Sequence, residues 1–289
     1  MSRATAPAAV RWTIYVAVAI VFAIACAFLS NWQFSRNAER SEQLTLIAAN
    51  YDREPVSLDT AIPSGATLNP LDEWLPVVLT GRYLSDEQLL ARNRPHSGTA
   101  AFEVLVPFQA DDGRVLLVDR GWVPPGNHQP DPDVIPAAPA GDVTVIVRLR
   151  PGEALPASGR SAPDGQVPTI NLAFVAELLD PTSAAALEQS AYGLMVSESP
   201  APPTRPQAVD APSADPGPYL SYAIQWILFA IMGFVFIWYV IRSERRARRE
   251  DAEDRAAVAA GVEPPTRAPV KRRRDRDAED EDALLDSTR

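Results

Sequence analysis

The side chains that most often perform chemistry in proteins are scarce in this chain of 289 residues. Cys26 is the single cysteine, and His96 and His128 are the two histidines. One thiol excludes an internal disulfide, a paired-thiol redox motif, a covalent haem c attachment and a two-thiolate copper site. With so few ligands, the sequence does not predict a zinc or copper site built from protein side chains alone.

The catalytic motifs that sequence can reveal are also missing. The chain holds no glycine-rich phosphate loop, no Gly-x-Ser-x-Gly turn and no His-Glu-x-x-His pair. Asp111 and Asp112 precede Gly113, which is typical of a turn and not of a catalytic carboxylate pair. His96 and His128 lie in proline- and glycine-containing stretches, and we interpret both as solvated loop histidines. We therefore predict that the protein is not an enzyme; a membrane hydrolase would need a nucleophile that the sequence does not show.

Polar and aromatic residues gather instead where two long apolar runs end. The set is Trp32, Gln33, Arg36, Tyr219, Tyr222, Gln225 and Trp226. Trp32 and Arg36 are four residues apart, which places them on one side of a helix. One interpretation is interfacial anchoring, with Trp32 among lipid headgroups and Arg36 on a lipid phosphate. The other is a specific contact surface at the membrane mouth.

Two apolar runs must position these side chains. Residues 12–32 and 219–241 are each long enough, as helices, to cross the ~30 Å hydrocarbon core of a bilayer, and aromatic residues mark their ends. A cleaved signal peptide is the competing interpretation of the first run. A retained anchor is favoured because the run is longer than a signal core, because Trp32 closes it, and because a helix-compatible polar stretch continues to about Asn50.

The distribution of arginine predicts the topology. Arg3 and Arg11 precede the first run, and five arginines lie in residues 242–249, directly after the second run. Because basic residues stay on the cytoplasmic side, both termini are predicted to be cytoplasmic and the region between the spans extracytoplasmic. The predicted location is the cell membrane, in a multi-pass arrangement.

The middle of the chain is acidic and rich in strand patterns. Residues 30–220 contain 12 arginines against 24 acidic residues, which argues against a nucleic-acid partner. Short Val- and Leu-rich segments predict strands at 75–84, 88–93, 100–109, 114–123, 143–150 and 192–199. Because no helices separate most of them, we expect a mainly antiparallel sheet. Residues 171–179 and 183–189 predict short helices.

We therefore expect a membrane protein of the α+β class, with two transmembrane helices on either side of a mainly antiparallel β domain. The predicted segments are a cytoplasmic N-terminus (1–11), a transmembrane helix (12–32), an extracytoplasmic α+β domain (33–198), a Pro-rich linker (199–218), a second transmembrane helix (219–241) and a disordered charged cytoplasmic tail (242–289).

One strand ends in an unusual combination of residues. The segment 115–126 runs from Val and Leu into Arg120, Gly121 and Trp122, and two prolines then end the strand. Gly121 would allow a bulge or a close backbone approach, and Trp122 could pack over it. We interpret these three residues as a structural brace, with a partner-binding surface as the alternative.

Four of these segments, in this order, resemble the surfeit locus protein 1 family. They are NWQFSR (31–36), PVVLTGRYL (76–84), VLLVDRGWVP (115–124) and YLSYAIQW (219–226), and the resemblance runs from about Trp12 to Ile241. It implies a two-span protein whose outer domain assists the biogenesis of haem-copper cytochrome c oxidase, acting on subunit I around the stage of haem a insertion. Subunit I is the implied partner, with haem a synthase as a further candidate, beside membrane lipid.

The chain departs from the family at one position. Bacterial members have been proposed to bind haem a through a histidine in an H-L-x-Y-A-x-Q-W pattern, and Tyr219 stands at that position here. Tyrosine ligates iron chiefly as phenolate and favours ferric iron. We therefore expect no permanently bound cofactor and only a transient contact with haem a.

The resemblance suggests roles for two polar residues. We hypothesise that Arg36 pairs with a haem propionate or with an acidic residue of the oxidase, and that Gln225 bonds to Gln33 or to a client helix. The alternative function is a bitopic membrane scaffold or sensor that recruits a partner through its extracytoplasmic domain.

Overall fold

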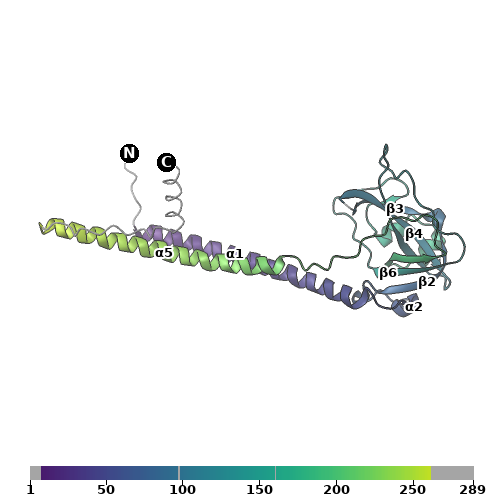
Figure 1. The fold of residues 1–289 in the computed structure, drawn as a ribbon, viewed down its shortest axis with the longest axis horizontal. Coiled ribbons are helices and arrows are strands. Elements are labelled where there is room, and N and C mark those ends of the chain that lie inside the picture. The colour runs from purple at the N-terminus through teal and green to yellow at the C-terminus, as the bar shows by residue number, and fades with distance from the viewer. Residues whose placement is uncertain (1–7, 97, 160, 262–289) are drawn as a thin grey trace, which may run out of the picture. The chain divides into compact units, whose positions relative to one another are not determined.

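The chain forms two compact units in a computed structural model, which describes residues 8–96, 98–159 and 161–261 (Figure 1). We call Met1–Trp32 together with Ser221–Arg289 the helical unit, and Gln33–Leu220 the β domain.

The helical unit contains α1 (Ala8–Asn50) as far as Trp32 and α5 (Tyr219–Ala259) from Ser221 onward. These two helical segments lie side by side (Figure 1). Most of their large apolar side chains are exposed, among them Val21, Phe28 and Phe236. Exposed apolar surface costs about 25 cal/mol per Å² in water, so both helices need an apolar environment. Their length and composition suggest membrane association.

Small residues form the contact between the two helices. Ala19, Cys26 and Ser30 are buried at spacings of seven and four residues on α1, and Ala223 is buried on α5. Oγ of Ser30 donates a hydrogen bond to the carbonyl oxygen of Ala223 at 3.0 Å. At Gly233 an added Cβ would lie 3.1 Å from an aromatic ring of α1. Small side chains thus allow the helices to approach closely, as is usual for helices in membranes.

The predicted disordered tail is wrong for residues 242–259, which continue α5 as a helix. The segment is rich in Ala, Glu and Arg, all good helix formers. Arg246 with Glu250, and Arg248 with Glu244, form ion pairs at i, i+4 spacing. The helix ends just before Gly261, whose φ is +68°. The remaining tail, residues 262–289, lies outside the described residues.

The β domain is built on one sheet of eight strands in the order β1-β2-β6-β8-β5-β4-β3-β7. Their bounds are β1 (Val56–Ser57), β2 (Pro76–Tyr83), β3 (Leu89–His96), β4 (Thr99–Ala110), β5 (Val115–Val123), β6 (Val143–Arg150), β7 (Gln166–Val167) and β8 (Tyr192–Ser199). All six predicted strands are present. The sheet is mixed: the longer pairings are antiparallel as expected, but the short pairings β1–β2, β3–β7 and β5–β8 are parallel.

An additional pairing of β2 with β4 closes β2, β6, β8, β5 and β4 into a ring. The closure passes through Gly81, whose φ is +152°. An added Cβ there would lie 2.0 Å from the carbonyl oxygen of Gln109. Glycine is therefore required where the two strands come together.

Strand β5 separates two apolar cores, and every residue on it is buried. Leu116 and Val118 point into a core that also contains Val77 and Val145, whereas Leu117 points into a second core with Ile170. Successive side chains on a strand point to opposite faces, so the segment 115–118 of β5, which is covered on both faces, is apolar throughout.

Short helices complete the domain. They are α2 (Leu58–Ala61), α3 (Leu172–Ala176) and α4 (Pro181–Ala186), with 3₁₀ turns η1 (Pro70–Asp72) and η2 (Ser85–Glu87). The two predicted helices are confirmed as α3 and α4. Proline is the first residue of α4. Its missing N–H costs no helical hydrogen bond there, because N–H groups in the first turn of a helix have no partner within the helix.

The end of α1 is fixed to the β domain through Asn50, which is buried. Its Nδ2 donates to the carbonyl oxygens of Leu71 and Glu73, at 2.7 and 2.9 Å. The guanidinium of Arg148 lies 3.6 Å from the ring centroid of Tyr51, the next residue along the chain. These contacts orient the polar second half of α1, which carries Gln33 and Arg36.

Candidate functional site

The residues predicted at the membrane mouth lie on α1 and on the first turns of α5. Within the helical unit, Trp32, Tyr222 and Gln225 are exposed, while Trp226 is half-buried against Phe229 with ring centroids 5.7 Å apart. Within the β domain, which includes the start of α5, the structure brings Arg36 and Tyr219 together. This pair is the part of the predicted site that can be described as a contact.

Arg36 presents a cation beside an aromatic ring. Its guanidinium carbon lies 5.8 Å from the ring centroid of Tyr219, within the range of a cation–π interaction. Its Nη1 also donates to Oε2 of Glu39 at 3.1 Å, with both side chains about half exposed. Exposed ion pairs of this kind contribute only about 0–1 kcal/mol. Arg36 is therefore able to exchange this partner for a stronger anion.

Gln33 has an unmet hydrogen-bonding group. Its Oε1 is buried and has no partner among the residues that the structure describes. A buried polar atom left unpaired costs about 1–3 kcal/mol. The expected bond from Gln225, which is exposed on α5, stays a prediction. A donor supplied by another molecule would satisfy the same atom.

Arg40 bonds the chain segment that precedes Tyr219 to α1. Its Nη2 donates to the carbonyl oxygen of Ser213 at 2.6 Å, and its Nε donates to that of Asp215 at 3.0 Å. The Pro-rich segment before α5 is thus bonded to α1 a single turn beyond Arg36. This attachment limits where Tyr219 can lie relative to Arg36.

A second candidate location is the end of β5, where Arg120 is completely buried. Its Nη2 lies 2.8 Å from Oε1 of Glu198, which is also buried, and its Nη1 donates to the carbonyl oxygen of Pro136 at 3.0 Å. The hydroxyl of Tyr83 donates to Oε2 of Glu198 at 3.0 Å. Burial, followed by the charge of Glu198, raises the pKa of Tyr83, which keeps this hydroxyl protonated.

This buried group comes from three strands of the ring: β2, β5 and β8. Because Arg120 has no exposed surface, it makes its contacts inside the domain. The geometry therefore supports a bracing role for Arg120, which stays a prediction until it is tested by substitution.

Gly121 and Trp122 attach the Pro-rich segment to β5. The N–H groups of Trp122 and Gln207 each donate to the other's carbonyl oxygen, at 2.8 Å. Gly121 has a φ of +117°, and an added Cβ would lie 2.2 Å from the same carbonyl of Gln207. The ring of Trp122 stacks on His96 with centroids 5.0 Å apart and an angle of 1°. Part of the predicted linker is thus fixed to the domain.

The prediction that His96 is a solvated loop histidine is wrong. His96 is the last residue of β3, and its side chain is buried between Trp122 and Glu103. Its Nε2 lies 3.1 Å from Oε1 of Glu103. Proline and glycine around His96 indicated a loop, but β3 extends through Pro95 because β4 pairs with it beyond a bulge. His128, by contrast, is exposed in a loop as predicted.

Glu103 belongs to a cluster of charged groups next to Trp122. Nε of Arg94 lies 2.5 Å from Oε2 of Glu103, and its Nη2 lies 2.7 Å from Oε1 of Glu153. Asp119 is buried beside them and accepts a hydrogen bond from the N–H of Gly121 at 2.9 Å. Burial, together with the charge of Glu103, raises the pKa of Asp119 well above its usual range.

The raised pKa of Asp119 predicts a pH dependence of stability. Because its pKa is higher in the folded state than in the unfolded state, the stabilisation is complete below about pH 4 and is lost as the pH rises through the folded-state pKa. Asp119→Asn removes this titration and keeps an oxygen for the N–H of Gly121. We expect the variant to gain stability relative to the parent as the pH rises, measured by urea unfolding of the full chain in detergent between pH 4.5 and 8.

Asp112→Asn is the matched control, because its stability difference from the parent is expected to stay constant between pH 4.5 and 8. Desolvation raises the pKa of Asp112, but hydrogen bonds from Arg114 outweigh it, so the pKa is lowered. This carboxylate stabilises the fold above its unfolded pKa, and the contribution is lost as the pH falls. Equal pH dependence of the parent and Asp119→Asn would contradict the assignment to Asp119.

Three of the residues in these buried groups were not singled out in the sequence: Tyr83, Glu103 and Glu198. Tyr83 and Glu198 lie on different strands, and the sequence pattern of each strand indicates only which face is apolar and which is polar. It therefore could not predict the hydrogen bond between the two side chains. The sequence contains one signal that could have indicated the buried charged cluster: Glu103 is the single acidic residue in the apolar run 100–109. An isolated charge within a buried strand indicates a partner of opposite charge.

The fold and the site define a class: a protein in which two long apolar helices accompany one α+β domain built on a closed, mixed sheet. The motif segments occupy α1, β2, β5 and the start of α5. The model of the SURF1 family matches residues 20–231. The chain belongs to the SURF1 family, and the resemblance predicted from its motifs is confirmed.

Relatives with curated names extend the comparison. Uncharacterized SURF1-like proteins of Mycobacterium bovis and Mycobacterium tuberculosis are each 38% identical over 252 residues, which cover 83% of this chain and 87% of the relative. The cytochrome oxidase assembly protein SHY1 of Saccharomyces cerevisiae is 27% identical over 107 residues, or 36% of this chain and 26% of SHY1.

Proposed function

We propose that this protein assists the assembly of haem-copper cytochrome c oxidase and acts on subunit I at the stage of haem a insertion. Membership of the SURF1 family and the similarity to the yeast assembly protein SHY1 support a role in oxidase assembly. In this role it is a non-catalytic membrane protein with cytoplasmic termini and an outer β domain. Haem a is handled as cargo, in transient contact, and haem a synthase is a second partner.

The observation that carries the finer proposal is the Arg36–Tyr219 pair. Arg36 is a half-exposed cation whose one ion pair is weak, and it lies at the end of an apolar helical stretch. A guanidinium bonds carboxylates through two parallel N–H groups, so Arg36 suits a haem propionate or an acidic residue of the oxidase. Tyr219 supplies the hydroxyl and the aromatic face beside it.

Gln33 and Gln225 each supply a further polar contact to the client. The unpaired oxygen of Gln33 accepts a donor from a client helix, and the exposed amide of Gln225 reaches the same client within the apolar layer. Trp32, Tyr222 and Trp226 provide aromatic contacts to the same client. Arg120, Gly121 and Trp122 hold the β domain and the Pro-rich segment in shape.

The proposal predicts a spectral defect in membranes. Deletion of the gene is expected to lower the haem a signal of the reduced-minus-oxidised spectrum and the oxidase activity, with b- and c-type cytochromes intact. Re-expression of Arg36→Gln or Gln225→Leu is expected to restore the signal only in small part, because a hydrogen bond to a charged group contributes about 1.5–3 kcal/mol.

Arg82→Gln is the matched control, since Arg82 is an exposed arginine on β2 that bonds only to Gln109 among the described residues. It is expected to restore the signal fully. If Arg36→Gln and Gln225→Leu complement as well as Arg82→Gln, then these residues do not form the contact site. An unchanged spectrum in the deletion strain would contradict the assembly function itself.

A further inference from the structure

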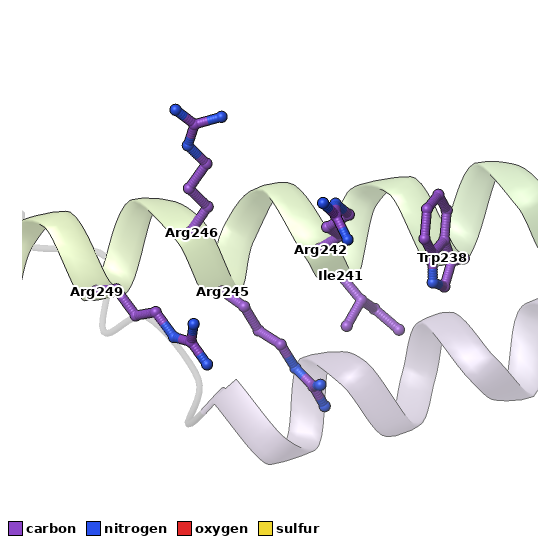
Figure 2. Close-up of a pocket in the computed structure, with 6 residues that line it drawn as sticks. All are labelled: Trp238, Ile241, Arg242, Arg245, Arg246 and Arg249. Atoms are coloured by element: carbon purple, nitrogen blue, oxygen red, sulfur yellow. The ribbon is translucent and has the colours of Figure 1, made fainter.

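The far end of α5 carries a stripe of arginines that the proposed function does not use. Trp238, Arg242, Arg245 and Arg249 are spaced by four, three and four residues, so they share one side of the helix. With Ile241 and Arg246 they line an open pocket of about 530 Å³ (Figure 2). The stripe directly follows the apolar stretch of α5.

Three of these arginines have no counter-charge within the described part of the chain. Among residues 10–261 as described, Arg242, Arg245 and Arg249 form no ion pair with a carboxylate. Like charges three and four residues apart on a helix repel one another, so the stripe is unfavourable unless an anion joins it. The neighbouring arginines differ: Arg246 pairs with Glu250, and Arg248 pairs with Glu244.

Glu244, a carboxylate on the same helix, is already occupied. Glu244 accepts hydrogen bonds from Arg11 and from the indole N–H of Trp12, besides its pair with Arg248. Arg245 lies over the ring of Trp12, 4.9 Å from its centroid, which positions the guanidinium without neutralising it. Figure 2 shows Arg245 and Arg249 on one side of α5, with Arg246 directed away from them.

The pocket combines this positive charge with apolar surface. Trp238 is 61% exposed, and the guanidinium of Arg242 lies 5.4 Å from its ring centroid. Ile241 lies between them and is half-buried. Tryptophan and arginine at the end of an apolar helix occupy the headgroup layer of a bilayer. A ligand of this pocket must therefore offer an anion at one end and hydrocarbon at the other.

We propose that this pocket binds the phosphate of an anionic phospholipid, with Arg242 and Arg249 as its main ligands and Trp238 beside the glycerol and upper acyl chain. Guanidinium groups bond phosphate through paired N–H donors, which gives the site preference for a phosphate over bulk anions. A free phosphate ion would use the arginines but leave Trp238 and Ile241 without a partner. The lipid is the occupant that satisfies both parts.

The test is a lipid titration of the full chain in nonionic detergent, with bound lipid counted by native mass spectrometry. Phosphatidylglycerol is the probe, phosphatidylcholine is the zwitterionic comparison, and inorganic phosphate is the competitor. A basic residue near an anionic lipid surface contributes about fivefold in affinity, so Arg242→Gln with Arg249→Gln is expected to weaken phosphatidylglycerol binding roughly 10- to 30-fold.

Arg248→Gln with Arg255→Gln is the matched control. It removes the same charge from the same helix, but neither residue lines the pocket. It is expected to leave the affinity within about twofold of the parent, since the effect of surface charge is local. Circular dichroism of both variants is expected to show the helix content of the parent.

Three outcomes would overturn the proposal. Equal weakening by both double variants would show general charge attraction and no defined pocket. Equal affinity for phosphatidylcholine and phosphatidylglycerol would remove the need for an anion. Displacement of the lipid by millimolar inorganic phosphate would identify a free-anion site in place of a lipid site. None of these measurements depends on oxidase assembly, so they stand apart from the proposed function.

Discussion

Glu198→Ala is expected to destabilise the β domain by about 3–5 kcal/mol, because it leaves the charge of Arg120 buried and unpaired. Arg120 has no exposed surface, and its Nη2 and Nε both face the Glu198 carboxylate, at 2.8 and 3.3 Å. The substitution also removes the acceptor of the Tyr83 hydroxyl. The measurement is hydrogen exchange of the full chain in detergent, followed in peptides from β5 and β8, where exchange should quicken by more than about 100-fold.

Two further variants test whether the loss of the Arg120–Glu198 ion pair, and not substitution in general, causes the destabilisation. Arg120→Met with Glu198→Met removes both charges and keeps apolar volume, and we expect most of the lost stability to return. Asp112→Ala breaks a more exposed pair with Arg114 and is expected to cost less than about 1 kcal/mol. If Glu198→Ala were as mild as Asp112→Ala, the ion pair would not brace the ring.

The strands of the β domain were predictable because their apolar pattern is local. In β6, Val143, Val145, Val147 and Leu149 are buried while the residues between them are more exposed, as the alternation in the sequence predicted. The parallel pairings were not predictable in the same way. Two of them involve the two-residue strands β1 and β7, which leave no periodic pattern, and the third joins Val118 of β5 to Gly193 of β8, far along the chain.

The closure of the ring also depends on contacts that no local pattern contains. Gly81 was part of a recognised motif, but its role appears only when β4 comes within bonding distance of β2. The end of α5 was misjudged for a different reason. Charged composition indicated a solvated tail, whereas helix propensity and i, i+4 pairs favour a helix through Ala259.

For the candidate site, the sequence predicted that the residues lie on two helices, but it could not give their contacts. Arg36 and Tyr219 are 183 positions apart in the chain, and their approach depends on Arg40 holding the Pro-rich segment. For His96 the sequence prediction failed. The neighbouring proline and glycine indicated an exposed loop, but His96 is buried because Trp122 and Glu103, on other strands, pack against it. Long-range pairing decides both cases.

Gly121→Ala is the second substitution with a large expected effect, because two costs coincide there. A φ of +117° is strained for any residue with a Cβ, and that Cβ would lie 2.2 Å from a backbone oxygen of Gln207. The strain costs about 1–3 kcal/mol, and displacement of Gln207 would break both of its hydrogen bonds with Trp122. We expect a loss of about 3 kcal/mol or more, measured by urea unfolding of the full chain in detergent.

Gly113→Ala distinguishes the clash from the strain. Gly113 has a φ of +88° in the β4–β5 turn, yet nothing lies within 4 Å of an added Cβ. It carries the backbone strain alone, and its loss is expected to stay near 1–2 kcal/mol. In Gly121→Ala, faster hydrogen exchange should also appear at Gln207, because the Pro-rich segment leaves β5; in Gly113→Ala it should not. Equal losses in the two variants, with Gln207 protected in both, would show that the close approach of Gln207 does not require glycine.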